Sequence, residues 1–238
     1  MTSIQLETIS INLIGSSSLS ASEDCCIYLV SDRDSSNSSI LIDTGAGSDR
    51  SINAICRNME AINPVSEVCY ILVTHAHIDH VGGLRTMKSR LPQAKVIAHT
   101  YAADVIRKGD PVRSAAKWYN TSLLSAEIDI EIGDTFKKPI GKSGTFQVLH
   151  TPGHTPGSVV GFLTSHSAYQ SVLFGQDIHG PFMSEFNSDI DRWRQSMETL
   201  LGLEADYLCE GHFGIIEGKK NVREFIKGYL RRYSYANS

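Results

Sequence analysis

The sequence predicts one α/β domain that spans residues 1–238. Short apolar runs typical of β-strands dominate both halves of the chain, and segments with helical spacing separate them. No linker rich in proline and glycine divides the chain near its midpoint. A chain of 238 residues can bury a substantial core, so we expect all of these elements to share one domain.

The first part of the chain predicts strands that alternate with helices. Residues 51–59 have helical spacing, because Ile52, Ile55 and Met59 recur on one side. Helices are also predicted at residues 81–90, 101–107 and 115–124. Apolar runs predict strands at residues 9–13, 26–30, 39–42, 68–73 and 94–98. We interpret the serine-rich tracts 16–20 and 35–39 as polar loops that join strands.

The second part continues with strands and closes with two helices. Strands are predicted at residues 128–132, 146–149, 158–163 and 171–174. The two amphipathic helices are residues 190–201 and 222–230, and a short apolar run at 207–209 lies between them.

Composition excludes several classes of function. The formal net charge is -4, which gives no electrostatic reason to expect a nucleic-acid partner. Five cysteines without a C-x-x-C pair are interpreted as reduced, largely buried thiols. The first residues, MTSIQLETIS, lack the basic and apolar regions of a leader, and no apolar run has the length of a membrane span. We therefore expect a cytoplasmic protein without a membrane partner.

Residues 72–83, LVTHAHIDHVGG, concentrate groups that can bind a cation. If the chain leaves a strand here and stays extended, His75, His77 and Asp79 alternate onto one side, while His80 points elsewhere. The four side chains diverge too much for one tetrahedral ion, but two adjacent ions could divide them. The segment therefore predicts a site for two metal ions.

Three further candidate ligands follow strand-like runs later in the chain. His154 lies between two Pro-Gly pairs, Asp177 follows the apolar residues 172–174, and His212 follows residues 207–209. Five imidazoles and two carboxylates suit zinc, and iron or manganese accept similar nitrogen and oxygen donors.

At this point the motifs resemble a known family. His75-Ala76-His77-Ile78-Asp79-His80, followed in order by the three later candidates, resembles the H-x-H-x-D-H signature and later ligands of the metallo-β-lactamase-fold superfamily. Asp43 matches the early strand-end aspartate of that family, so the resemblance covers about residues 25–215. It implies a four-layer αβ/βα sandwich for the whole chain.

The resemblance also implies a role for each candidate ligand. It implies two sets of ligands joined by one bridging residue: His75, His77 and His154 for the first ion, Asp79, His80 and His212 for the second, and Asp177 between them. Asp43 would orient one of these ligands through hydrogen bonds. Gln176 stands where the family commonly has glycine, so we expect an altered local shape beside Asp177.

The remaining histidines and aromatic residues have simpler interpretations. We expect structural roles for His99, His150 and His166. The candidates for substrate contact are His179, Trp118, Phe182 and Met183, because the first lies close to Asp177 and the others could form apolar walls.

The predicted activity is hydrolysis of a small-molecule ester, lactone, thioester or phosphoester. Two adjacent ions can lower the pKa of a bridging water from about 15.7 to near 7, which supplies a metal-bridged hydroxide, and Asp79 would orient it as the catalytic residue. Two alternatives share the same site. One is a mononuclear iron dioxygenase of the persulfide-oxidising type, and the other is a ligand-binding or regulatory protein with low turnover.

The substrate is narrowed mainly by exclusion. Glyoxalase II-like enzymes carry Gly-Cys-Gly-Arg shortly after the bridging aspartate, whereas residues 178–183 here are IHGPFM, which disfavours a glutathione thioester. Lactonases that act on quorum signals use a tyrosine for which there is no obvious counterpart beside Asp177.

Overall fold

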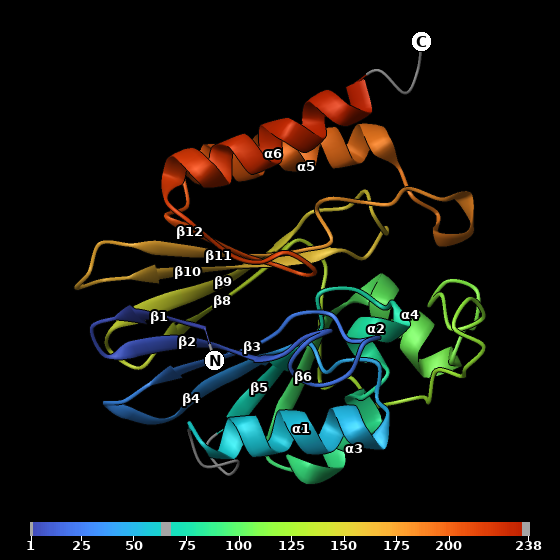
Figure 1. Ribbon diagram of the computed structural model, residues 1–238, viewed down its shortest axis with the longest axis horizontal. Coiled ribbons are helices and arrows are strands. Elements are labelled where there is room, and N and C mark those ends of the chain that lie inside the picture. The colour runs from blue at the N-terminus through green and yellow to red at the C-terminus, as the bar shows by residue number, and fades with distance from the viewer. Residues whose placement is uncertain (1, 63–67, 235–238) are drawn as a thin grey trace.

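The computed structural model describes residues 2–62 and 68–234. The strands form two sheets that lie face to face, and helices cover the outer face of each sheet (Figure 1). Helices α1 (Asp49–Glu60) and α3 (Leu84–Arg90) lie on one side, and α5 (Ile190–Gly202) and α6 (Lys219–Ser234) on the other. The four-layer sandwich predicted from the resemblance is therefore confirmed.

The first sheet contains seven strands in chain order: β1 (Ser3–Leu6), β2 (Ile9–Gly15), β3 (Ile27–Asp32), β4 (Ser35–Ile42), β5 (Val68–Leu72), β6 (Lys95–His99) and β7 (Ile130–Ile132). Pairing is antiparallel as far as β4 and parallel from β4 to β7. The parallel part places the ends of β4, β5 and β6 along one edge, where the chain enters loops and helices.

The second sheet has the order β13-β12-β11-β10-β9-β8. Its strands are β8 (Thr135–Ile140), β9 (Gly144–His150), β10 (Val159–Ser165), β11 (Ser171–Gln176), β12 (Tyr207–Glu210) and β13 (Gly214–Glu217). Only β11 and β12 pair in parallel among these strands. Those two strands therefore end at the same edge of the sheet.

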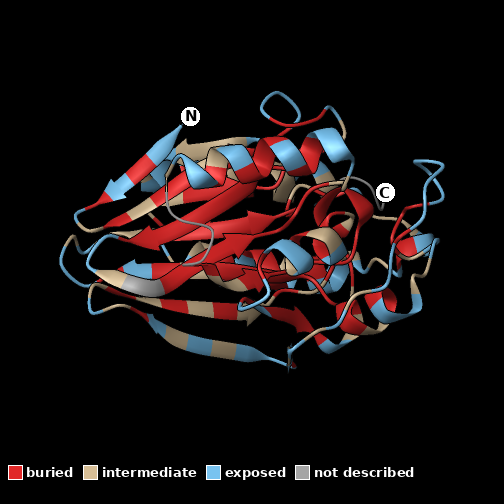
Figure 2. Cartoon of the chain, turned by 90° about the horizontal axis from the view of Figure 1, so that it is seen from below, coloured by how far each residue is buried: buried red, intermediate tan, exposed pale blue. Residues whose placement is uncertain are grey.

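Alternating side chains of the strands build separate cores between the layers. In β3, Ile27 and Leu29 contact the core beneath α1, whereas Tyr28 and Val30 contact the core between the sheets. A third core lies between the second sheet and helices α5 and α6. Figure 2 shows the result, with buried strands inside and exposed helix faces outside. Because both faces of the inner strands are covered, their sequences are nearly continuous apolar runs.

Two sequence predictions about element boundaries are wrong. The helix predicted at residues 81–90 is two helices, α2 (Ile78–Val81) and α3, with Gly82 and Gly83 between them. A Cβ atom at Gly82 would overlap the carbonyl oxygen of Ala46, so close contact between two backbones interrupts the helix there. The serine-rich tract 35–39 is the start of β4 rather than a loop, because tertiary pairing with β3 overrides its polar composition.

The helix predicted at residues 115–124 is also wrong. The segment forms turns and irregular loop after α4 (Thr100–Lys108), and it lies beside α4 at the right-hand end of Figure 1. Ala115 and Asn120 have φ angles of 59° and 50°, in the left-handed region that helices do not tolerate. Trp118 and Tyr119 remain about half exposed, so the two large aromatic side chains of the segment do not hold a helix against the core.

Candidate metal centre

Five strand ends converge on one edge of the sandwich. Asp43 follows β4, the segment that begins with His75 follows β5, and His154 lies in the loop after β9. Asp177 and His212 follow β11 and β12, the parallel pair of the second sheet. The predicted ligands therefore reach the same place from four strand ends, with four of the seven in the segment that follows β5.

The local conformation of residues 75–80 differs from the prediction in one respect. His77 is extended, with φ -71° and ψ 147°, and it caps the N-terminus of α2. Asp79 and His80 already belong to that helix, so the extended alternation expected to include Asp79 stops at His77. The turn of the helix, rather than strand alternation, directs Asp79 and His80 toward the second set of ligands.

The first set of predicted ligands lies together. Donor atoms of His75, His77, His154 and Asp177 all lie within 4.8 Å of one another, and all four residues are buried. The Oδ2 atom of Asp177 is 3.6 Å from Nε2 of His154 and 3.9 Å from Nε2 of His75. These separations are those of groups arranged around a common point rather than a simple ion pair.

The second set shares Asp177 with the first. Donor atoms of Asp79, His80, Asp177 and His212 also lie within 4.8 Å of one another. Nε2 of His212 is 3.3 Å from Oδ2 of both aspartates, and Nε2 of His80 is 3.2 Å from Oδ1 of Asp177. Asp177 therefore has donor atoms in both groups, which is the geometry that a bridging ligand requires.

Buried atoms without partners show that these residues fit metal ions. Within the described residues, Nε2 of His75, His77 and His80 and Oδ1 of Asp177 have no hydrogen-bond partner. Leaving one such buried polar atom unpaired costs about 1–3 kcal/mol, so the three on His75, His80 and Asp177 call for a ligand. His77 instead turns its Nδ1 toward Nε2 of His154, at 2.9 Å. The donor set is nitrogen and carboxylate oxygen, which zinc, iron and manganese accept.

The protonation of the first set of predicted ligands also suits a cation. Burial lowers the pKa of His75 well below its usual value and that of His77 to about 3, so both imidazoles are neutral and can act as ligands. Burial alone would raise the pKa of Asp177, but His80 and His212 hold it well below its usual value. The carboxylate of Asp177 is therefore ionised.

Hydrogen bonds to neighbouring groups fix the orientation of two ligands. Nδ1 of His80 donates to Oδ2 of Asp43 at 2.7 Å, and Asp43 also accepts from the backbone N–H and the hydroxyl of Thr74. Nδ1 of His154 donates to the carbonyl oxygen of Pro181 at 2.8 Å. In both imidazoles the Nε2 atom is thereby left to face the metal centre.

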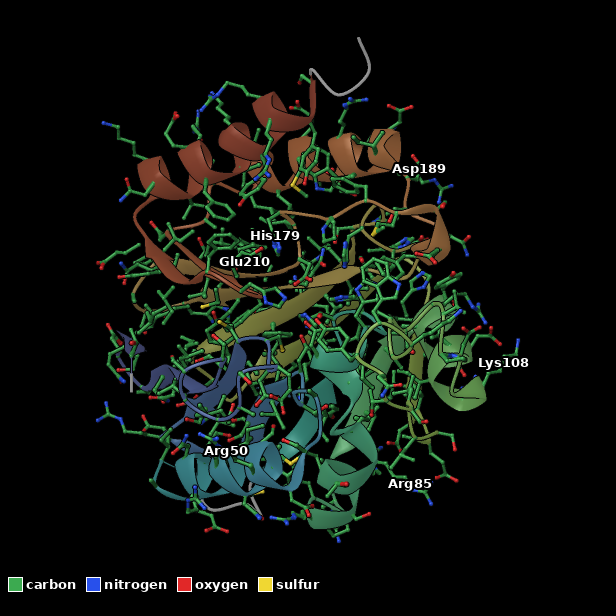
Figure 3. All side chains as sticks on the ribbon, turned by 45° about the vertical axis from the view of Figure 1, so that its right-hand side comes forward. Arg50, Arg85, Lys108, His179, Asp189 and Glu210 are labelled. Carbon is green, nitrogen blue, oxygen red and sulfur yellow. The ribbon has the colours of Figure 1, made fainter. Side chains whose placement is uncertain are left out.

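Sequence reasoning missed the role of Glu210. This fully buried carboxylate accepts hydrogen bonds from the backbone N–H groups of His212 and Phe213, at 2.7 and 3.2 Å. Its other oxygen lies 2.8 Å from Nδ1 of His179, and Figure 3 shows the two side chains next to each other. The available signal was an acidic residue at the buried end of an apolar strand, two positions before a predicted ligand.

A small cleft leads to the metal centre. It has a volume of about 210 Å³. Its walls include three of the predicted ligand histidines, His179, and the residues Trp118, Tyr119, Pro181 and Phe186. The ring of Phe186 lies 4.3 Å from that of His77 and 4.8 Å from that of Trp118. We call this hollow the metal cleft.

Comparison with known proteins decides the family. A sequence model of the metallo-β-lactamase superfamily matches residues 24–212, most of the chain. The chain belongs to this superfamily of metallo-hydrolases. The resemblance stated from the sequence is thereby confirmed.

Curated relatives in this superfamily carry several names. "Thioesterase pkgB" of Emericella nidulans is 26% identical over 193 residues, which are 80% of this chain and 46% of that protein. "Probable metallo-hydrolase YybB" of Bacillus subtilis is 26% identical over 203 residues, 81% of this chain and 82% of that protein. An uncharacterized protein of Aquifex aeolicus is 31% identical over 122 residues, 51% and 52% of the two chains. The chain thus spans about half the length of two of these relatives.

Solved structures share the metallo-β-lactamase fold over almost the whole chain. A metallo-β-lactamase from Cronobacter sakazakii has a TM-score of 0.77 at 20% identity, covering 98% of this chain and 93% of that one. The metallo-β-lactamase MIM-1 from Novosphingobium pentaromativorans has a TM-score of 0.71 at 17% identity, covering 88% and 82%. At such identities the likeness concerns the fold.

The four predicted substrate contacts lie in different places within this metallo-β-lactamase fold. Among the described residues, His179 and Trp118 line the metal cleft, but Phe182 and Met183 do not. The ring of Phe182 instead packs against Trp193 and Tyr233, at 5.0 and 4.7 Å, in the core beneath α5 and α6. The ring of Phe182 is more stable packed among aromatic side chains than exposed at the cleft. Phe186 forms the apolar wall that was expected from Phe182.

The other histidines and the cysteines lie outside the metal cleft. His99 and His150 stack on each other with ring centroids 4.1 Å apart, and His166 is near the hydroxyl of Thr145 on the surface. None of the five cysteines forms a disulfide, and four of them are buried, as the composition predicted. No helix in the described part of the chain has the length and apolar character needed to cross a membrane.

Proposed function

We propose that this chain is a dinuclear metal-dependent hydrolase that cleaves a small ester, lactone or thioester by attack of a hydroxide on the carbonyl carbon. The observation that carries the proposal is the sharing of Asp177 between two four-residue groups, in which buried atoms of His75, His80 and Asp177 have no hydrogen-bond partner. Zinc suits this donor set best, with iron and manganese as the other candidates.

The residues of the chain would divide the work among them. His75, His77 and His154 would hold one ion, and Asp79, His80 and His212 the other. When bound, the two ions would lower the pKa of a shared water to near 7 and polarise the carbonyl oxygen of the substrate. Asp79 lies in both the metal centre and the cleft wall, so its carboxylate would orient the nucleophile and accept its proton.

The walls of the metal cleft favour an uncharged acyl substrate over a phosphoester. None of the described residues that line it is lysine or arginine, the side chains that usually recognise phosphate. Five of the wall residues are apolar or aromatic: Ala115, Trp118, Tyr119, Pro181 and Phe186. The relative named as a thioesterase, which aligns over 80% of this chain, supports a thioester as the first substrate class to test. We propose no nucleic-acid partner.

An activity panel tests this proposal. Protein saturated with zinc should hydrolyse members of a panel of aryl esters, lactones and acyl thioesters, and the Asp79→Asn variant should lose at least about a hundredfold in kcat. Full activity of Asp79→Asn with unchanged metal content would remove the role of Asp79. Oxygen uptake by iron-loaded protein, without hydrolysis, would instead support the dioxygenase alternative. Absence of both activities would support a ligand-binding protein.

A further inference from the structure

A second hollow adjoins the metal cleft on the other side of Tyr119. This side groove has a volume of about 660 Å³, and Tyr119 lines both hollows. Ile78 also lines the side groove, and its neighbours in the chain, His77 and Asp79, line the metal cleft. The two hollows are therefore neighbours, with Tyr119 and residues 77–79 between them.

The floor of the side groove is rigid backbone. Gly47 and Gly82 lie against each other so closely that a Cβ on either would overlap backbone atoms, and Ala46 is part of the same contact. The N–H of Ala46 donates at 2.8 Å to Asp24, a buried carboxylate that also accepts from the hydroxyl of Ser51 at 2.7 Å. A floor fixed in this way is preorganised, which reduces the entropy lost on binding.

Three large apolar or aromatic side chains are exposed at the outer wall of the side groove. Trp118, Tyr119 and Leu124 are 49%, 50% and 50% exposed, although they lie in one short loop. Tyr119 and Leu124 line the side groove, and Trp118 lines the metal cleft. Clustered apolar side chains of this kind mark binding surfaces more often than isolated ones do. Glu23 is the only charged residue among the described lining, so the groove offers no cation to an acidic ligand.

We propose that the side groove binds an uncharged apolar chain of the substrate, so that the substrate is an amphipathic ester or thioester. Its scissile group would lie in the metal cleft, and its chain would pass Tyr119 and lie between Ile78 and Leu124. This inference rests on the proposed hydrolase function. The groove would set specificity by burying methylene groups, each of which contributes to transition-state binding as it leaves water.

A series of thioesters of N-acetylcysteamine tests the inference. From acetyl through butyryl and hexanoyl to octanoyl, kcat/KM should rise about twofold to fourfold for each added methylene. Leu124→Asp places a charge in the wall, and Thr121→Trp fills the groove, so both should flatten this rise. Tyr169→Asp alters another exposed apolar residue, in the turn between β10 and β11, and should leave the series unchanged. Circular dichroism checks that each variant is folded.

Two kinds of failure are distinguishable. Turnover that does not depend on chain length, or a rise in kcat/KM that both groove variants retain, would contradict binding of the acyl chain in the side groove. Neither result would contradict the proposed hydrolase function. Absence of turnover for every thioester would count against the proposed function. A binding measurement would then test whether the side groove binds an apolar chain. The chain has two tryptophans, of which Trp193 is buried and Trp118 borders the cleft. Octanol should change the fluorescence of the wild type and of Tyr169→Asp but not of Leu124→Asp; no change in the wild type would overturn the inference.

Discussion

The Oδ2 atom of Asp43 lies 2.7 Å from Nδ1 of His80, and both residues are buried. Asp43 follows β4 of the first sheet, and its carboxylate is held in turn by two hydrogen bonds from Thr74. This contact fixes the ring of His80 so that Nε2 points toward Asp79 and Asp177. Cys25, Asp43 and His80 also lie close enough together to form a group of possible metal ligands. We do not treat this group as a separate site, because Nδ1 of His80 is hydrogen-bonded to Asp43.

Replacement of Asp43 by asparagine tests this orienting role. Asp43→Asn removes the charged acceptor, so the affinity for the second ion should fall by about 10-fold to 100-fold. Metal titration monitored by calorimetry measures the loss. Asp191→Asn, at a side chain that is 79% exposed, is the matched control and should bind both ions as the wild type does. Equal affinities in both variants would show that Asp43 does not position His80.

Gly211 should tolerate no side chain. A Cβ atom at this position would overlap Oδ1 of Asp177 and lie 3.2 Å from Cε1 of His80. Gly211→Ala should therefore displace the bridging carboxylate and reduce the metal content below two ions per chain, as measured by mass spectrometry of the metals. Gly202→Ala, where nothing lies within 4 Å of the new Cβ, should keep both ions. Two tightly bound ions in Gly211→Ala would contradict the assigned position of Asp177.

Glu210 should matter through the backbone that it holds. In Glu210→Ala, the N–H groups of His212 and Phe213 lose their acceptor, at a cost of about 1–3 kcal/mol in the free energy of unfolding. We also expect weaker binding of the second ion, because the loop that carries His212 is released. Chemical denaturation and metal titration measure the two effects. Unchanged stability together with unchanged metal affinity would show that Glu210 does not hold the loop that carries His212.

Metal binding should release protons. Burial acts to lower the pKa of His212, but Asp177 and Asp79 raise it to about 10 in the metal-free protein. A raised folded-state pKa contributes stability that is fully present below the unfolded value of about 6.5 and is lost as the pH rises through about 10. At pH 7 a metal must displace this proton, so the affinity should increase as the pH rises between about 6 and 8. Calorimetry in buffers of different ionisation enthalpy measures the number of protons released on metal binding. A value of zero at pH 7 would contradict this prediction.

Much of the fold follows from local sequence patterns. The inner strands are apolar on both faces, so β3, β5, β6, β10 and β11 were predicted close to their observed bounds. Strands β1, β8 and β13, which were not predicted, lie at the edges of the two sheets. The sequence of β8, TFKKPI, alternates in burial and includes a proline that only an edge strand accepts. Edge strands have one exposed side, so their apolar signal is weak.

The site was predictable where its residues form a motif and not where packing decides. His75 to His80 follow a spacing that only a small set of functions needs, and the structure brings them to the later candidates at the predicted strand ends. The roles of Glu210 and Phe186 depend on contacts between segments far apart in the chain, which no local pattern records. Gln176 adopts a φ of 39°, in the region that glycine prefers, and accepts a hydrogen bond from the N–H of Asp177 through its own side chain.

The central claim is that the two groups of ligands bind two ions that share Asp177. The most direct measurement is the number of zinc ions per chain at saturation, by mass spectrometry of the metals after removal of free metal. We expect two ions for the wild type, one for His77→Ala and one for His212→Ala, because each variant disrupts a different group. A single ion in the wild type, or loss of no ion in either variant, would contradict it.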